Sequence, residues 1–397
     1  MKIILYDGPA HERLRPLTFG CPVGMLRLGV RPLHEKWSCI IGQPVDGFLP
    51  PVYLREMYPA PLEDAGDVLF IAADVVPHHA LWQEIAQLRP HSRLVFDEAT
   101  VAYRSDTPLD LEAVGQLPAV GSAAEVRRLL HPWDFFRLNG EAIAQDMALG
   151  DLPTTGDRPQ ARPDLHIRGQ HPVVVHPRAH LESAVLNATD GPIFIGPDAL
   201  IMEGSIIRGP FALCDEAVVK MGARIYGQTT IGPHCKVGGE LNNVLMMAYS
   251  NKGHDGFLGN SVLGSWCNLG ADTNNSNLKN NYGEVRMWSY PERATVETGL
   301  QFCGLIMGDH SKTGINTMLN TGTVLGMAVN AFGGGFPPRF MPSFSWGGPE
   351  GLEIHRLDEA LKTAERMMRR RGLRLDPRQT SIFRHVFEIE QPTQVPG

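Results

Sequence analysis

The sequence lacks the cysteine pattern of a disulfide framework or of a structural zinc site. Its six cysteines are scattered along 397 residues with no Cys-x-x-Cys and no paired zinc spacing, so we expect thiols that are partly buried. The sequence also lacks a surplus of basic residues, because the formal net charge is -7. This balance argues against nucleic acid or an anionic membrane as partner, whereas small phosphorylated metabolites need only local cations.

Long apolar runs are missing as well. The N-terminal residues Ile3 to Leu5 are followed by Asp7, which leaves too few apolar residues for the core of a signal peptide, and no later run approaches the length that spans a membrane. A cytoplasmic protein without a membrane partner is therefore expected. A chain of this length is also too long for one ordinary core, which favours two domains.

The N-terminal part shows an α/β pattern. Short apolar runs at residues 3–5 and 68–71 are typical of buried strands, and the second is followed by a helical stretch. We assign residues 1–122 to an α/β domain and residues 123–163 to a helical linker. Pro132 interrupts the linker, whose Pro- and Arg-rich end at residues 152–163 marks the domain boundary.

A six-residue repeat dominates the next part of the chain. Branched aliphatic residues recur at strict six-residue intervals, at Ile195, Ile201, Ile207, Leu213, Val219, Ile225, Ile231 and Val237. The spacing resumes later, at Met307, Thr313, Leu319 and Leu325. This period fits a three-sided prism, a parallel β-helix with about eighteen residues per coil. We predict it over residues 164–345; the alternative is an ordinary β-sandwich with repeating turns.

The C-terminal part, residues 346–397, is predicted to hold a helix and a tail. Its apolar residues have helical spacing, at Leu357, Leu361, Ala364, Met367 and Met368. We expect this helix to pack against the prism. The arginine run 369–371 that follows is interpreted as a solvated helix end rather than a ligand site.

The segment between the two repeat blocks resembles a known acetyltransferase. His254 is followed by Leu-Gly steps at Leu258, Leu263 and Leu269. This spacing is similar to that of the bifunctional UDP-N-acetylglucosamine pyrophosphorylase / glucosamine-1-phosphate N-acetyltransferase family, which implies a left-handed β-helix. The chain looks like an alternate, shortened subfamily of it. Three residues depart from the family pattern: Phe257 replaces a tyrosine, Asp272 a glycine and Asn242 a phosphate-binding lysine.

The resemblance implies that His254 is a general base and that acetyl-CoA is the acyl donor. An imidazole titrates near neutral pH, so it can accept a proton from an attacking amine or hydroxyl. Further candidates for substrate binding are Asn268, Arg224, Lys252, Asn277 and Lys279, of which the cations could replace the missing lysine. The alternatives are that His254 only caps a corner of the prism and that the asparagines of residues 274–281 are structural.

The N-terminal domain carries a second, weaker resemblance. Residues 13–18, Arg-Leu-Arg-Pro-Leu-Thr, and Pro22 are similar to the motif of sugar-1-phosphate nucleotidyltransferases. The resemblance implies that Arg13 holds triphosphate charge and that Asp74 binds Mg²⁺, although Asp74 could equally be a helix N-cap. The glycine-rich loop and the family lysine are missing, and Arg27 or Lys36 could compensate.

The leading hypothesis is a transferase of nucleotide-sugar biosynthesis. It would move an acetyl group from acetyl-CoA to an amino-sugar phosphate and, if the N-terminal domain is active, a nucleotidyl group from a nucleoside triphosphate to a sugar 1-phosphate. Two alternatives stay open: nucleotidyl transfer alone with the β-helix as a scaffold, and a non-catalytic regulatory protein that binds a nucleotide sugar. A homotrimer is expected, because prisms of this type usually build their sites between neighbours.

Overall fold

The computed structural model describes residues 1–62, 66–150, 152 and 164–390. The chain divides into two compact units. The first comprises Met1–Leu14, Gly20–Leu26 and Arg31–His131, and the second comprises Arg15–Phe19, Arg27–Val30 and Pro132–Gly397. Most of the predicted boundary segment, residues 153–163, lies outside the described residues.

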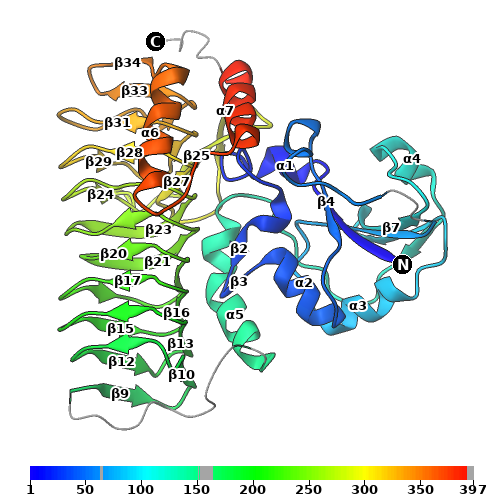
Figure 1. The fold of residues 1–397 in the computed structure, drawn as a ribbon, viewed down its shortest axis with the longest axis horizontal. Coiled ribbons are helices and arrows are strands. Elements are labelled where there is room, and N and C mark those ends of the chain that lie inside the picture. The colour runs from blue at the N-terminus through cyan, green and yellow to red at the C-terminus, as the bar shows by residue number, and fades with distance from the viewer. Residues whose placement is uncertain (63–65, 151, 153–163, 391–397) are drawn as a thin grey trace. The chain divides into compact units, whose positions relative to one another are not determined.

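The first unit is built on a six-stranded sheet in the order β4-β1-β5-β7-β6-β8 (Figure 1). Its strands are β1 (Lys2–Tyr6), β4 (Gly47–Leu49), β5 (Val68–Ala72), β6 (Ser92–Phe96), β7 (Ala99–Ser105) and β8 (Ala119–Gly121). The helices are α1 (Ala10–Arg13), α2 (Leu33–Ile41), α3 (His79–Ala86) and α4 (Leu111–Gln116). The two apolar runs seen in the sequence form β1 and β5, which pair in parallel and are buried. The predicted α/β pattern is confirmed.

The second unit contains a parallel β-helix whose strands stack in three columns (Figure 1). One column contains β9 (His166–Gly169), β12 (Val185–Ala188), β15 (Ile206–Arg208), β18 (Arg224–Ile225), β21 (Glu240–Met246), β23 (Phe257–Leu263), β24 (Asn274–Asn275) and β29 (Met318–Leu319). The next contains β10 (Val173–Val175), β13 (Ile193–Ile195), β16 (Phe211–Leu213), β19 (Thr229–Ile231), β27 (Leu305–Met307), β30 (Thr323–Leu325) and β32 (Phe340–Met341), with the second halves of β21 and β23.

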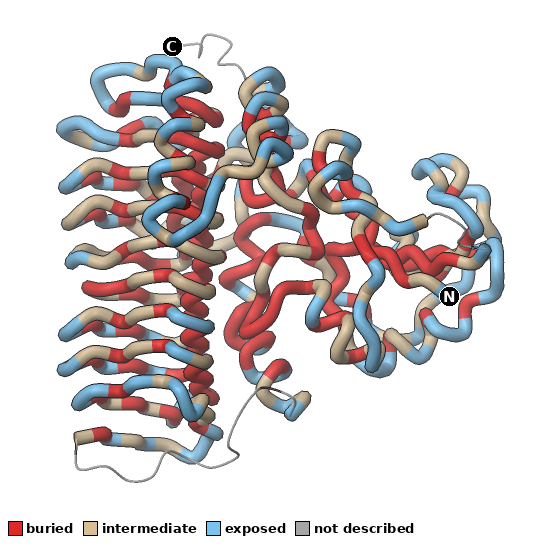
Figure 2. Tube along the Cα trace, in the orientation of Figure 1, coloured by how far each residue is buried: buried red, intermediate tan, exposed pale blue. Residues whose placement is uncertain are grey.

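The third column contains β11 (His180–Leu181), β14 (Leu200–Ile201), β17 (Val218–Val219), β20 (Lys236–Val237), β22 (Asn251–Lys252), β28 (Lys312–Thr313), β31 (Asn330–Ala331) and β33 (Ser345–Gly348), closed by the antiparallel β34 (Gly351–Ile354). All eight residues of the first repeat block are buried in one core. In Figure 2 the buried stretches of successive coils lie above one another. The prediction of a β-helix is confirmed, and the sandwich alternative is excluded.

The coil length explains why the six-residue spacing is interrupted. Ile195, Leu213 and Ile231 are paired on neighbouring coils, eighteen residues apart. Ile231 then pairs with Met246, and Met246 with Leu263, so these coils have fifteen and seventeen residues. The β-helix therefore continues through the interrupted stretch with shorter coils, and β21 and β23 each run around a corner.

A longer insertion separates the next pair of coils. Leu263 pairs with Met307, and residues 276–304 leave the prism between them. They include the hairpin of β25 (Arg286–Ser289) and β26 (Ala294–Glu297). Beyond the insertion the eighteen-residue spacing returns, because Met307 pairs with Leu325.

The helical predictions need two corrections. The predicted linker contains one described helix, α5 (Asp134–Ala148), whereas the stretch before Pro132 is extended and forms a bridge from Arg128 to Val75. The C-terminal part contains two helices, α6 (Leu357–Arg369) and α7 (Pro377–Ile389), instead of one. The start of α7 has a capping box of Asp376 and Gln379 and a proline at its first position, signals that the sequence already contained.

Both C-terminal elements contact the prism. The Phe383 ring of α7 lies edge-on to His310 and to Phe344, and Arg371, just after α6, donates to the carbonyl oxygen of His234. These contacts show packing of α7 on the prism and a hydrogen bond from the residues that follow α6. Within the described residues, no helix has the length and apolarity needed to cross a membrane.

Neighbouring residues of β15 offer a matched test of the prism core. The Ile207 side chain is fully buried, whereas Ile206 is 53% exposed. We expect Ile207→Ala to lower the free energy of unfolding by about 2–5 kcal/mol, because it leaves a cavity between coils. The control Ile206→Ala should change it by about 0.5 kcal/mol or less. Urea unfolding followed by circular dichroism measures both, and equal effects would contradict the assigned inward register.

Candidate functional site

An asparagine corner forms where β21 and β23 turn from one face of the prism to the next. Each strand turns at an asparagine with positive φ, Asn243 at 55° and Asn260 at 46°. Asparagine occupies this left-handed region at lower cost than most residues. Asn277 extends the column, since its Nδ2 donates to Asn260 Oδ1 over 2.7 Å. Asn243, Asn260 and Asn277 are called the asparagine corner below.

Gly259 lies beside this corner and has no side chain. A Cβ atom built there would lie 2.5 Å from the Phe257 ring and 2.8 Å from Asn277 Nδ2. Only glycine leaves room for the ring and the amide to meet over the strand. The combination of an aromatic ring with a polar amide is typical of small-molecule sites.

Two further asparagines fix the strand that carries Phe257. Asn275 lies inside the prism, where its Oδ1 accepts from the Gly259 amide over 2.8 Å and its Nδ2 donates to the Gly259 carbonyl over 3.0 Å. Asn274 Oδ1 accepts from the Phe257 amide over 2.8 Å. Because both side chains are bonded to backbone, the structural alternative stated for the asparagine cluster applies to these two.

His254 lies in the turn between β22 and β23, three residues before Phe257. The side chain is exposed, and among the described residues no group lies within hydrogen-bonding or ion-pair distance of its imidazole. The ring is therefore open to solvent and to a ligand. His254 and Asn277 lie at neighbouring corners of the prism, so a single chain does not bring them together.

Lys252 does not fit the predicted role in substrate binding. Its side chain is buried in the prism, paired in register with Val237. The Nζ atom donates to the carbonyl oxygens of His254 over 2.6 Å and Asp255 over 3.1 Å, and burial lowers the pKa of the ammonium to about 8. Lys252 thus holds the turn that presents His254.

The other candidates on this part of the prism are spread over two columns. Arg224 is exposed and lies 3.6 Å from Glu240 on the neighbouring strand. Asn242, at the position of the family lysine, leaves no cation there. Asn268 pairs with Asn251 and Lys312 in the third column, away from the asparagine corner.

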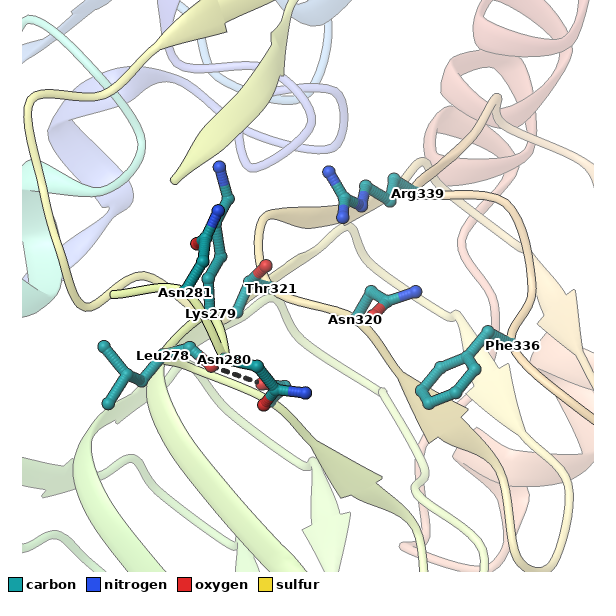
Figure 3. Close-up of a pocket in the computed structure, with 9 residues that line it drawn as sticks. Leu278, Lys279, Asn280, Asn281, Asn320, Thr321, Phe336 and Arg339 are labelled. Carbon is teal, nitrogen blue, oxygen red and sulfur yellow. Dashed lines mark hydrogen bonds between the residues drawn. The ribbon is translucent and has the colours of Figure 1, made fainter. Parts of the chain in front are cut away.

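Lys279 lines a pocket of about 540 Å³ whose lining includes Ser276 and Leu278, the two neighbours of Asn277 in the chain. The pocket is shown in Figure 3, where the guanidinium of Arg339 points toward the side that carries Thr321 and Lys279. The complete lining is Ser276, Leu278, Lys279, Asn280, Asn281, Asn320, Thr321, Phe336 and Arg339. The sequence did not single out Arg339, because it lies outside every motif.

In the first unit, the structure places Arg13 and Asp74 in contact with each other. Asp74 is buried, and Arg13 donates to its Oδ2 over 2.9 Å. Arg128 binds the same carboxylate with two hydrogen bonds, of 3.0 and 2.8 Å. Burial and the nearby Asp74 raise the pKa of Tyr6, which stays protonated beside the pair.

This arrangement does not fit the predicted Mg²⁺ role of Asp74. Magnesium takes oxygen ligands in octahedral geometry, but both oxygens of Asp74 already accept hydrogen bonds from guanidinium groups. The described residues also contain no group of three His, Cys, Asp or Glu side chains suited to hold a metal. Asp74 instead anchors two arginines by charge-assisted hydrogen bonds.

The sequence did not reveal a chain of three hydrogen-bonded side chains, formed by the buried Asp7 and His11 and the partly buried Tyr53. His11 Nδ1 lies 2.9 Å from Asp7 Oδ2, and His11 Nε2 lies 2.9 Å from the Tyr53 hydroxyl. Burial raises the pKa of Asp7 against the lowering effect of His11. The available signal was an Asp and a His four residues apart in the loop where glycines were expected.

Arg27 belongs to the second unit and is not available for the predicted phosphate role. Its guanidinium donates to the carbonyl oxygen of Val30 and lies 3.6 Å from Cys214 Sγ on the prism. Both partners are buried. The side chain therefore ties an N-terminal segment to the β-helix.

Comparison with known proteins finds one family model and several relatives that match part of the chain. Residues 3–152 match the family model described as sugar nucleotidyl transferase. The chain is 25% identical over 201 residues to the bifunctional protein GlmU of Cyanothece sp., covering 48% of this chain and 40% of that protein. It is 27% identical over 212 residues to the GlmU of Synechococcus elongatus, covering 51% and 42%. Over about half of its length the chain is therefore similar in sequence to GlmU proteins.

Two other matches have low sequence identity. The GlmU of Nostoc sp. is 21% identical over 290 residues, which cover 66% of this chain and 56% of that protein, so the chain spans about half the length of the GlmU proteins it matches. An Arabidopsis UDP-N-acetylglucosamine acyltransferase structure is 15% identical and covers 59% of this chain and 85% of its own, with a TM-score of 0.20. The GlmU-like chain differs from the family motif at Phe257, Asp272 and Asn242.

Two Asp–Arg pairs of the first unit allow a matched test of the anchor. We expect Asp74→Asn to lower the free energy of unfolding by roughly 3–5 kcal/mol, because it removes the buried countercharge that two partly buried guanidinium groups share. Asp67→Asn breaks a partly exposed pair with Arg104 and should cost about 1 kcal/mol or less. Equilibrium urea unfolding measures both variants. Equal losses of unfolding free energy in the two variants would contradict a larger contribution of the buried Asp74 pair to stability.

Proposed function

We propose that this GlmU-like chain is a transferase of nucleotide-sugar biosynthesis that moves an acetyl group from acetyl-CoA to the amino group of an amino-sugar phosphate. One observation carries the proposal. The β-helix presents an exposed His254 in a turn that Lys252 holds, three residues before Phe257, and at the next corner the Asn277 amide and the Phe257 ring approach Gly259. The spacing of this segment is that of the acetyltransferase family.

The reaction needs one base and one group that binds the acceptor. The amine nitrogen attacks the thioester carbonyl, a C–N bond forms, the C–S bond breaks and the coenzyme A thiolate leaves. His254 accepts the proton that the amine loses and can return it to the leaving thiolate. Phe257 and Asn277 offer an apolar face and a hydrogen-bonding amide for the sugar.

Removal of the imidazole tests this mechanism. We expect His254→Gln to lower kcat for acetyl transfer by about 10²- to 10⁴-fold, because it removes the general base. The control His180→Gln replaces an exposed histidine of β11 and should leave kcat unchanged. Mass spectrometry of the acetylated product, with circular dichroism as a check on folding, gives the rates. An unchanged kcat in His254→Gln would remove His254 from the mechanism.

A trimer of this chain would complete the site. His254 and Asn277 lie at neighbouring corners of one prism, so a second copy can supply the group that one chain leaves distant. The β-helix also exposes large apolar side chains at two turns, Met221 with 69% and Ile315 with 74% of its surface accessible. We propose that these two turns form part of the apolar interface of the trimer.

Sedimentation equilibrium tests the trimer. We expect three times the mass of one chain, and a lower mass for the variant Met221→Asp, because it places charges in the proposed apolar interface. Val52→Asp, at an exposed apolar residue of the first unit, is the control and should keep the trimer. A monomeric mass for the unmodified protein would contradict the proposal.

A second candidate function concerns the first unit. The sugar nucleotidyl transferase match covers it, but the pairing of Asp74 with two arginines favours binding of a nucleotide sugar without Mg²⁺ over nucleotidyl transfer to a sugar 1-phosphate. Incubation with nucleoside triphosphates, Mg²⁺ and sugar 1-phosphates separates the two. A nucleotidylated product would support transfer, and tight binding of nucleotide sugars in EDTA without turnover would support binding alone.

A further inference from the structure

The pocket beside the asparagine corner carries an excess of positive charge. Lys279 and Arg339 line it, and the lining contains no Asp or Glu. Among the described side chains, no carboxylate lies within ion-pair distance of either cation. The Lys279 Nζ donates to the carbonyl oxygen of Glu284, which positions the ammonium and leaves it two further hydrogens to donate.

The remaining lining residues suit a ligand in which an anionic group is attached to a polar molecule. Asn280, Asn320 and Thr321 supply amide and hydroxyl groups, and Phe336 adds one apolar face. In Figure 3 Asn320 lies between the cationic side of the pocket and Phe336. A volume of about 540 Å³ lies in the range of small-molecule sites.

The larger hollow of the second unit differs in its charge. It has a volume of about 810 Å³ and is lined by residues of α5 and by prism residues that include Asp190 and Asn260. Its two arginines are already paired, Arg208 with Asp190 at 2.5 Å and Arg137 with Asp134 at 2.9 Å. Paired guanidinium groups attract a further anion less, so the smaller pocket is the stronger anion site.

We infer that the pocket lined by Lys279 and Arg339 binds the phosphate group of the acceptor. This inference rests on the proposed function and deepens it. The pocket starts at Ser276, next to Asn277 of the asparagine corner, and Asn242 leaves the family position without a cation. The two cations lie in an inserted segment and in a later coil, and they form charge-assisted hydrogen bonds to the phosphate oxygens.

Calorimetric titration of the full chain tests the pocket. The probes are glucosamine 1-phosphate, inorganic phosphate and glucosamine, and the variants are Lys279→Gln and Arg339→Gln. Each variant should lower the affinity for glucosamine 1-phosphate about 10-fold or more, because it removes a charged donor. The affinity for glucosamine should stay unchanged. Arg339→Lys should retain part of the affinity. The control Arg293→Gln, in the same insertion but outside the pocket lining, should bind like the unmodified chain.

Each outcome separates the pocket from the proposed function. Unchanged affinity in both variants, an equal loss for glucosamine, or no binding of either phosphate probe to the unmodified chain would overturn the pocket. If the variants lose phosphate binding while no amino-sugar phosphate is acetylated, the pocket stands and the acetyl transfer fails. If acetyl transfer proceeds with an unchanged KM in both variants, the pocket fails and the transfer stands.

Discussion

The parallel register between coils is the constraint on which the second unit depends. Each inward aliphatic residue packs on its counterpart one coil away, as Ile195, Leu213 and Ile231 do. This stacking fixes which side chains face outward and where each corner falls. When a coil shortens, the chain must still return to the same register, so β21 and β23 turn within a continuous strand. The asparagine corner is the local consequence of that demand.

The sequence predicted the β-helix because its signal is local and repeated. The same logic fails at Lys252, which was a candidate for substrate binding because of its place beside the His254 motif. The coil that contains it has fifteen rather than eighteen residues, so Lys252 comes into the inward row below Leu269 and above Val237. No spacing rule derived from eighteen-residue coils places it there. Its ammonium donates hydrogen bonds to carbonyl oxygens of the next turn. Lys252, a candidate for substrate binding, therefore has a structural role.

The remaining misplacements share a different cause, the distance along the chain between partners. Asp74 follows a strand as metal-binding aspartates do, but Arg128, 54 residues later, takes both of its oxygens. Arg27 is near the expected motif and is bonded instead to the prism near Cys214, 187 residues away. A motif specifies which groups are present, whereas such pairings depend on the folded arrangement. Arg339 escaped notice for the same reason, since Lys279 precedes it by sixty residues.

The charge chemistry of the two units therefore follows different rules. In the first unit a buried carboxylate is neutralised by two guanidinium groups, so a divalent cation would have to displace charge-assisted hydrogen bonds before it could bind Asp74. On the β-helix, the cations of the pocket have no described countercharge, and the exposed histidine has no described partner. Polar groups without partners can bind a ligand, whereas groups that are bonded to one another stabilise the fold. By this argument the described cations that remain open to an anionic ligand lie on the β-helix, whereas the arginines at Asp74 in the first unit are held by a carboxylate.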